Sequence, residues 1–193
     1  MKLKDKSACG ADGISSRFLK DSLPILAFYL TFIINTSIVT GVVPIEWKYA
    51  IVCPGFKKGD NEDATNYRPI SLLSILSKVL ERVVADQLSE YLSANQLLSC
   101  SQHGFRKHLS TQTALTQVME RLYHNVENNK ISLLALCDLS KAFDSVSHEI
   151  LLKKMKSLNI DEFWFKDYLS DRFQSVKKNS HISTKKSVSF GVP

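Results

Sequence analysis

The stretch that decides the fold is Leu134–Val146, which reads LALCDLSKAFDSV. An apolar run, 131–137, ends abruptly at Asp138, and a second carboxylate, Asp144, follows six residues later. A short apolar run rich in Ile and Leu is typical of a buried strand, although its periodicity also fits a helix. An aspartate at the end of a strand is held on rigid backbone, where it can bind a hard cation such as Mg²⁺. Asp138 is equally well explained as a capping carboxylate, because Asp is common at caps.

Length and composition indicate one globular domain with a basic surface. The chain has 193 residues, of which 44% are hydrophobic and 23% charged, and this excludes a disordered chain. The net charge is +6 with a pI near 9.1, which suits a polyanionic partner. The basic excess is strongest over 150–193, with nine Lys or Arg against four Asp or Glu. Beside the motif at Asp138, this excess favours contact with a nucleic-acid backbone over a merely solvated face.

Cysteine spacing and hydropathy predict an intracellular protein, in the cytoplasm or nucleus. The four cysteines, Cys9, Cys53, Cys100 and Cys137, form no Cys-x-x-Cys pair, so we expect free and mostly buried thiols in a reducing compartment. The charged segment 1–6 is followed by no apolar core of a signal peptide, which argues against secretion. The most apolar stretch, 24–34, is too short to span a bilayer and predicts a buried helix.

Periodicity and capping residues predict an α/β (α+β) fold that is rich in helices. The clearest helix covers 74–95, with Ser74 as a natural cap and apolar residues at helical spacing. The other expected helices cover about 22–39, 111–128, 148–158 (capped by Ser147) and 161–171, and the expected strands cover 47–53, 175–178 and 187–190. We expect Pro54 and Gly55 to end the first of these strands.

The string Asp138-Leu-Ser-Lys-Ala-Phe-Asp144 resembles the first catalytic motif of reverse transcriptases of non-LTR (LINE-type) retrotransposons. The resemblance extends to Gly10-Ala-Asp-Gly-Ile14, Lys57-Lys-Gly-Asp60, Asn66-Tyr-Arg-Pro-Ile-Ser-Leu72, Gln102-His-Gly-Phe-Arg106 and the pair Ser110-Thr111. It implies the fingers and a partial palm of a right-hand polymerase in one domain. Residues of about 1–109 and 148–193 would be fingers-like, and about 110–147 would start the palm.

The resemblance also implies roles for individual residues. The Asp138 carboxylate and the backbone carbonyl of Leu139 would bind catalytic Mg²⁺, with Mn²⁺ as a substitute, and Phe143 would exclude the 2′-hydroxyl of ribonucleotides. Arg68, assisted by Lys57 or Lys58, would contact the triphosphate of the incoming dNTP, and Arg106 would lie near the nucleotide or the template. The implied partners are an RNA template, a DNA primer and dNTPs, with no membrane. For the lysine pair the alternative is an ordinary surface hairpin.

One part of the family's machinery is missing from this sequence. Two catalytic metals require several carboxylates, and the family supplies the others from a later Tyr/Phe-x-Asp-Asp hairpin. No Asp-Asp pair is present, and the sequence stops at Phe190-Gly-Val-Pro193, where relatives continue with Gln-Gly. We therefore expect the first half of an RNA-directed DNA polymerase domain, inactive without the rest of the palm and the thumb. The alternatives are a non-catalytic nucleic-acid-binding remnant of a decayed mobile element, or an unstable product of a partial reading frame.

Two further groups of residues contain the side-chain types of a known kind of site but do not predict one. His103 near Cys100 supplies too few ligands for a zinc site. Ser147, His148 and Asp144 contain the residue types of a hydrolase triad, but no Gly-x-Ser-x-Gly elbow is present.

Overall fold

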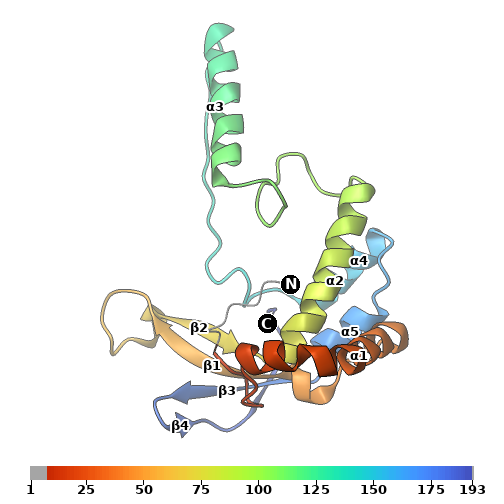
Figure 1. The fold of residues 1–193 in the computed structure, drawn as a ribbon. Coiled ribbons are helices and arrows are strands. Elements are labelled where there is room, and N and C mark those ends of the chain that lie inside the picture. The colour runs from red at the N-terminus through yellow and green to blue at the C-terminus, as the bar shows by residue number, and fades with distance from the viewer. Residues whose placement is uncertain (1–7, 193) are drawn as a thin grey trace. The chain divides into compact units, whose positions relative to one another are not determined.

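The structure, a computed structural model, describes residues 8–192 as helices and one five-stranded sheet (Figure 1). The chain divides into two compact units, which are described separately. The first contains residues up to Arg82 and from Lys141 onward, and the second contains Val83–Ser140. Helix α2 (Ile75–Ala94) begins in the first unit, and its later turns belong to the second. Mixed helices and a sheet confirm the predicted α/β class at this coarse level.

The sheet of the first unit is built around β1 (Tyr49–Phe56). On one side β1 pairs antiparallel with β2 (Tyr67–Leu72), and on the other it pairs parallel with β3 (Arg172–Lys178). Two short strands, β4 (His181–Ile182) and β5 (Lys186–Val188), pair antiparallel with β3. The late strands were predicted near these positions, whereas the pairing of β3 with β1 joins segments that lie far apart in the sequence.

The prediction that Pro54 and Gly55 end the first strand is wrong. Pro54 lies opposite Pro69, and Gly55 lies opposite Arg68, so β1 continues to Phe56. Proline lacks an N–H donor and is tolerated where no ladder hydrogen bond is needed. Because β3 pairs with β1 only over Tyr49–Val52, Pro54 lies beyond the part of β1 that needs a donor on that side.

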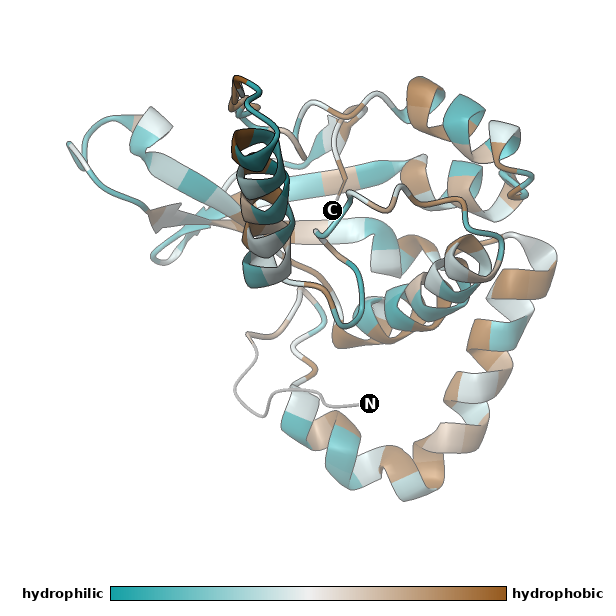
Figure 2. Ribbon diagram, turned by 90° about the horizontal axis from the view of Figure 1, so that it is seen from above, coloured by the Kyte–Doolittle hydropathy of each residue, from teal (hydrophilic) through white to brown (hydrophobic). Residues whose placement is uncertain are grey.

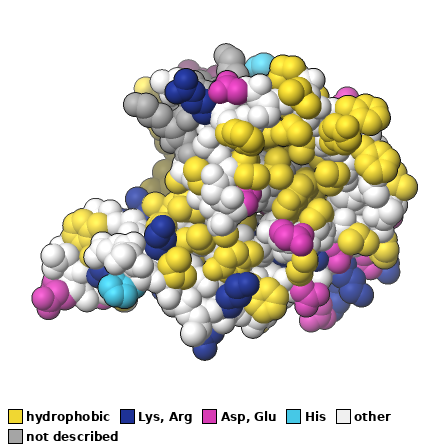
Figure 3. Space-filling view, turned by 60° about the horizontal axis from the view of Figure 1, so that its bottom comes forward, with side chains coloured by type: hydrophobic (Ala, Val, Ile, Leu, Met, Phe, Trp, Pro, Cys, Tyr) yellow, Lys and Arg dark blue, Asp and Glu magenta, His cyan; other side chains and the backbone are white. Residues whose placement is uncertain are grey.

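Helix α1 (Ser16–Thr40) begins at Ser15, whose side chain accepts a hydrogen bond from the Phe18 N–H, and ends at Gly41 with φ 68°. The prediction of a buried helix at 24–34 is wrong, because a row of large apolar side chains on α1 is exposed: Phe18, Ile25, Phe28, Tyr29, Phe32 and Val39. Figure 2 shows hydrophobic residues along this helix, and Figure 3 shows a broad group of them on one face of the molecule. By length and composition alone α1 could cross a membrane, a test that the core helices of soluble proteins also pass.

An ion pair joins the segment that follows α1 to helix α5 (Phe163–Leu169). The buried Lys48 Nζ, in the 3₁₀ turn η1 (Ile45–Lys48), lies 2.9 Å from Asp167 Oδ2, which also accepts the Val43 N–H at 2.7 Å. Burial raises the pKa of Asp167, but the hydrogen bonds from Val43 and Lys48 and the charge of Lys48 together lower it further, so the pKa lies below its ordinary value. Trp164 adds a buried hydrogen bond to Ser37 Oγ at 3.2 Å.

A second network links α5 to the first turns of α2. Tyr168 donates its hydroxyl to Glu81 at 2.9 Å, and burial followed by the charge of Glu81 raises the pKa of this tyrosine far above its ordinary value. Arg172 lies over the Tyr168 ring, 4.7 Å from its centroid, and donates Nη1–H to the Tyr168 carbonyl at 2.9 Å. These contacts attach the start of β3 to the helices.

The second unit differs most from prediction. Helix α3 (Thr111–Glu127) forms as expected, with a capping box between Ser110 and Thr113. The expected strand at 131–137 is absent, because none of the described strands pairs with it. Its apolar side chains are exposed, Leu136 by 88%. The thiols were also wrongly expected to be buried, since Cys9, Cys100 and Cys137 are exposed.

We predict that Asp167→Asn lowers the free energy of unfolding by about 3 kcal/mol at pH 7, because it leaves the buried Lys48 ammonium without its counter-charge. A depressed carboxyl pKa contributes stability above the unfolded pKa of about 3.9 and loses it as the pH falls through the folded pKa. Urea unfolding should therefore show the difference from wild type shrinking below about pH 4. Asp21→Asn, on the exposed face of α1, is the matched control and should change little. Equal losses in both variants would contradict the assignment.

Candidate nucleotide-binding site

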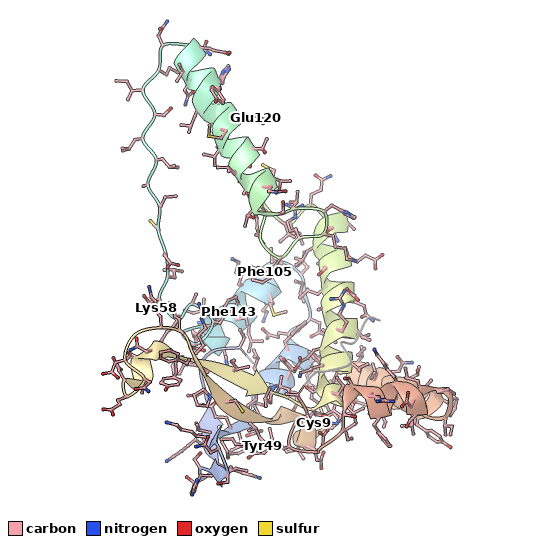
Figure 4. The ribbon with its side chains drawn as sticks, turned by 60° about the vertical axis from the view of Figure 1, so that its left-hand side comes forward. Cys9, Tyr49, Lys58, Phe105, Glu120 and Phe143 are labelled. Carbon is pink, nitrogen blue, oxygen red and sulfur yellow. The ribbon has the colours of Figure 1, made fainter. Side chains whose placement is uncertain are left out.

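Three of the predicted site residues lie on the β1–β2 hairpin. Lys57 and Lys58 follow β1 directly, Arg68 is the second residue of β2, and all three side chains are exposed. Figure 4 shows Lys58 on the loop of this hairpin. The hairpin therefore carries three exposed cations.

The loop that carries the lysines is held by its own polar groups. The Lys57 N–H donates to the Asn66 carbonyl at 2.9 Å, and Asn66 Nδ2 donates to the Asp60 carbonyl at 2.9 Å. Asp63 Oδ1 accepts both the N–H and the hydroxyl of Thr65 at 2.8 Å, and these bonds, the backbone one first, lower the pKa of Asp63. Such a loop presents charged side chains on a defined backbone.

Phe143 lies in the turn before helix α4 (His148–Ser157), as labelled in Figure 4. Lys141, at φ 52°, opens this turn, and its carbonyl accepts the N–H groups of Asp144 and Ser145. The Phe143 ring is 59% exposed, while its backbone carbonyl accepts the Val192 N–H at 3.0 Å. The backbone that carries this side chain is therefore held in place.

A cavity of about 310 Å³ lies against the sheet of the first unit. Its lining comes from strands β1, β2, β3 and β5 and from the segments around Asp144 and Gly191. The residues involved include Ala50, Val52, Pro69, Ser71, Arg172, Gln174, Val176, Val188, Phe190 and Val192. Because strand residues alternate between faces, Pro69 and Ser71 face this cavity and Arg68 belongs to the opposite face. The cavity and the cationic hairpin surface are thus separate features.

Sequence reasoning did not identify the polar residues of this cavity. Arg172 is 5% exposed, and its Nη2 has no hydrogen-bond partner among the described residues. Asp144 and Arg172 line the same cavity without forming an ion pair within it, as far as residues 8–192 show. In the sequence Arg172 was one more basic residue near the end of the chain, and no local signal distinguishes a buried arginine from a solvated one.

Asp138 and Leu139 lie in the second unit, on the exposed extended segment that was predicted as a strand. Among residues 8–192, no group of three or more His, Cys, Asp or Glu side chains is placed to hold a metal ion. One carboxylate and one carbonyl are too few for a two-metal centre. The described residues therefore do not complete a metal site, and the role of Asp138 remains a prediction.

Arg106 also belongs to the second unit. Its Nη1 donates to the carbonyls of Ser99 at 2.9 Å and Gln102 at 3.4 Å, which closes the loop between α2 and α3. The neighbouring Phe105, labelled in Figure 4, is 95% exposed. Arg106 therefore stabilises this loop, and its contact with the nucleotide or the template remains a prediction.

The two patterns set aside from the sequence find ordinary structural roles. The ring nitrogens of His103 contact Thr113 Oγ1 and Gln117 Oε1, each at 2.8 Å, and so fasten the loop to α3. Ser147 Oγ caps α4 by accepting the Ile150 N–H, and His148 Nε2 contacts the Gly191 carbonyl at 2.7 Å. Neither a zinc site nor a hydrolase triad is assembled by these residues.

Comparison with known proteins establishes the class to which this fold and these motifs belong. Residues 56–193 match the family described as reverse transcriptase (RNA-dependent DNA polymerase), and the chain belongs to this family. Its members are RNA-directed DNA polymerases, which are nucleotidyltransferases.

The relatives are the polymerases of mobile elements. The chain is 32% identical over 192 residues to the probable RNA-directed DNA polymerase from transposon BS of Drosophila melanogaster, covering 97% of this chain and 21% of the relative. It is 32% identical over 196 residues to the RNA-directed DNA polymerase from mobile element jockey of the same species, and this match covers 100% of this chain and 21% of the relative. It is 26% identical over 184 residues to the Pol polyprotein of retrotransposable element R2 from Popillia japonica, and this match covers 93% of this chain and 24% of the relative. The chain thus spans about a fifth of the length of its first relatives.

We predict that Asp138→Asn changes the free energy of unfolding by no more than about 0.5 kcal/mol, because the side chain is exposed. Thermal or urea unfolding of the chain measures this, with Asp167→Asn as the destabilised comparison. A loss comparable to that of Asp167→Asn would mean that Asp138 is a structural carboxylate, and its predicted catalytic role would lose its basis.

Proposed function

We propose that residues 1–193 form the fingers and the first part of the palm of a right-hand reverse transcriptase from a non-LTR retrotransposon. In this proposal 1–109 and 148–193 are fingers-like and 110–147 begin the palm. The observation that carries it is the family match over 56–193, which includes both the cationic hairpin and the Asp138 motif. The partners would be an RNA template, a DNA primer and dNTPs, and the site of action would be inside the cell.

The hairpin surface suits the triphosphate of the incoming nucleotide. Phosphoryl transfer is accelerated mainly by positioning and by cations near the developing charge. Arg68 offers a planar fork of donors for phosphate oxygens, and Lys57 and Lys58 offer point charges beside it. In the proposal these residues bind and orient the triphosphate, while the exposed Phe143 ring lies under the sugar and excludes the 2′-hydroxyl.

Asp138 and the Leu139 carbonyl would provide part of the site for Mg²⁺ or Mn²⁺. The other ligands would come from outside the described residues, because these supply no further carboxylate cluster. The 193-residue chain alone should therefore not extend a primer, and its measurable activity should be binding.

The second candidate is a nucleic-acid-binding protein without catalysis, a remnant of a mobile element. The exposed lysines of the hairpin favour it, and so does the lack, among residues 8–192, of a group of side chains placed to hold a metal ion. Both candidates predict binding, so only an assay of nucleotide addition separates them.

We predict that the chain binds a primer–template duplex with an affinity that falls steeply with salt, because lysine and arginine contacts release counterions from phosphates. The double variant Lys57→Ala/Lys58→Ala should reduce the slope of log affinity against log salt by about 1 to 2. Fluorescence anisotropy of a labelled duplex measures this. The matched control, Arg17→Ala/Lys20→Ala on α1, changes the net charge equally and should leave the slope nearer that of wild type. Identical slopes in the two variants would reject the hairpin as the binding surface.

Catalysis is tested in a chimera in which residues 1–193 replace the matching segment of the jockey polymerase. Asp138→Ala should lower primer extension by about 10²-fold or more, as expected for loss of a group that stabilises transition-state charge. Phe143→Val should preserve dNTP addition and increase ribonucleotide addition. A chimera that extends primers equally well with and without the Asp138 carboxylate would favour the non-catalytic candidate.

A further inference from the structure

The sheet of the first unit has a second face, on the side away from the cavity and from Arg172. Because strand residues alternate between faces, the strand registers place six residues on it, which define the outer face: Tyr49, Cys53, Ile70, Phe173, Lys177 and Ile182. Ile70, Phe173 and Ile182 are exposed, by 50%, 38% and 55%. In Figure 3 hydrophobic and basic side chains lie beside one another on one face of the molecule. Exposed apolar side chains that are grouped in this way mark an interaction surface.

The charge that the strands carry on the outer face is positive. None of the five strands contains Asp or Glu. Arg68 and Lys177 belong to this face by register, and Lys185 reaches it from the connection between β4 and β5. Lys177 and Lys185 are exposed, and neither forms an ion pair within residues 8–192. A polyanion is therefore the partner that complements this face.

An irregularity in the sheet directs Lys185 onto the outer face. Thr184 and Lys185 both lie opposite Ser175, because the residues on either side of them pair with Val176 and Gln174. Two residues opposite one form a β-bulge, which changes the direction of a side chain.

The Lys185 side chain is held by an aromatic ring two strands away. Its Nζ lies over the Tyr49 ring, 4.8 Å from the ring centroid. Tyr49 belongs to β1, so the Lys185 side chain crosses β3 on the outer face. Phe173 is the register partner of Tyr49. A fixed ammonium group and an exposed aromatic side chain thus occupy neighbouring positions on this face.

We propose that the outer face binds an unpaired RNA strand, with a base stacked on the Phe173 ring and phosphates held by Lys177 and Lys185. Proteins bind single strands by this combination of aromatic rings, on which bases stack, and cations along the backbone. A duplex keeps its bases stacked on one another, so an unpaired strand fits an exposed ring better. RNA is the strand that this family copies. None of the three residues belongs to the site proposed for the triphosphate, so the inference goes beyond that function.

Stacking is tested by fluorescence anisotropy of the 193-residue chain with a labelled RNA oligonucleotide that cannot pair with itself. Phe173→Leu keeps an apolar side chain on the sheet but removes the ring, and it should weaken binding at least about fivefold, whereas Phe173→Tyr should stay within about twofold of wild type. Phe28→Leu removes an exposed ring of α1 and should bind like wild type. Melting temperatures identify the folded variants, and equal affinities of folded Phe173→Leu and wild type would overturn the proposal.

The cations are tested by the salt dependence of the same binding. Lys177→Ala/Lys185→Ala should reduce the slope of log affinity against log salt by about 1.4, because each phosphate contact on a single strand contributes about 0.7. Arg17→Ala/Lys20→Ala on α1 removes the same charge and should leave the slope nearer that of wild type. An equal change of slope in the two variants would reject the outer face as the binding surface.

The kind of partner is tested by exchanging the probe. Phe173→Leu should leave the affinity for a duplex of the same length unchanged, and an equal loss for duplex and single strand would overturn the choice of an unpaired strand. Tighter binding of the same sequence made of DNA would overturn the choice of RNA. Sedimentation without RNA covers the remaining alternative: a dimer that Phe173→Leu dissociates would assign the outer face to a second copy of the chain.

Discussion

The first unit depends on the pairing of Lys48 with Asp167. A buried ammonium is tolerated only when a counter-charge satisfies it. Here the Lys48 side chain is 4% exposed, and the partly exposed Asp167 carboxylate also accepts the Val43 N–H. This contact fixes the start of β1 against the helix that precedes β3. Parallel pairing of β1 and β3 begins at Tyr49 and Phe173, within a few residues of the ion pair on each segment. The β1–β2 hairpin, with its cations, extends from the strand so positioned.

Features that depend on neighbouring residues could be predicted from the sequence. The helices that begin near Ser74, Ser110 and Ser147 lie within a few residues of their predicted bounds, because capping and apolar spacing act within one or two turns. Ser15 likewise caps α1, within one turn of the residues that it serves. The family, too, could be identified from short motifs, since each is a local string of residues.

Features that depend on residues far apart in the sequence could not be predicted from it. Nothing in the local sequence states which strand lies beside β1, and the proline pair at Pro54 and Pro69 resembles a strand end until its register is known. Hydrophobicity predicted burial for both α1 and 131–137, yet burial also needs a covering surface, and the described residues provide little for either. The same limit applies to the contact between His148 and Gly191, which are ordinary residues of the sequence until the backbone brings them together.

The exposure of 131–137 and the incomplete metal site have one physical origin. A carboxylate at a strand end is rigid only when its strand is paired, since unpaired extended backbone is hydrogen-bonded to water and moves. Residues 131–137 pair with none of the described strands, and among residues 8–192 no group of three or more His, Cys, Asp or Glu side chains is placed to hold a metal ion. A strand that paired with this segment would order its backbone and fix Asp138 at the same time, and layers packed on the two faces of that sheet would bury Leu133 and Leu136. In the proposed function, pairing this segment and placing Asp138 for a metal ion would therefore be one folding step.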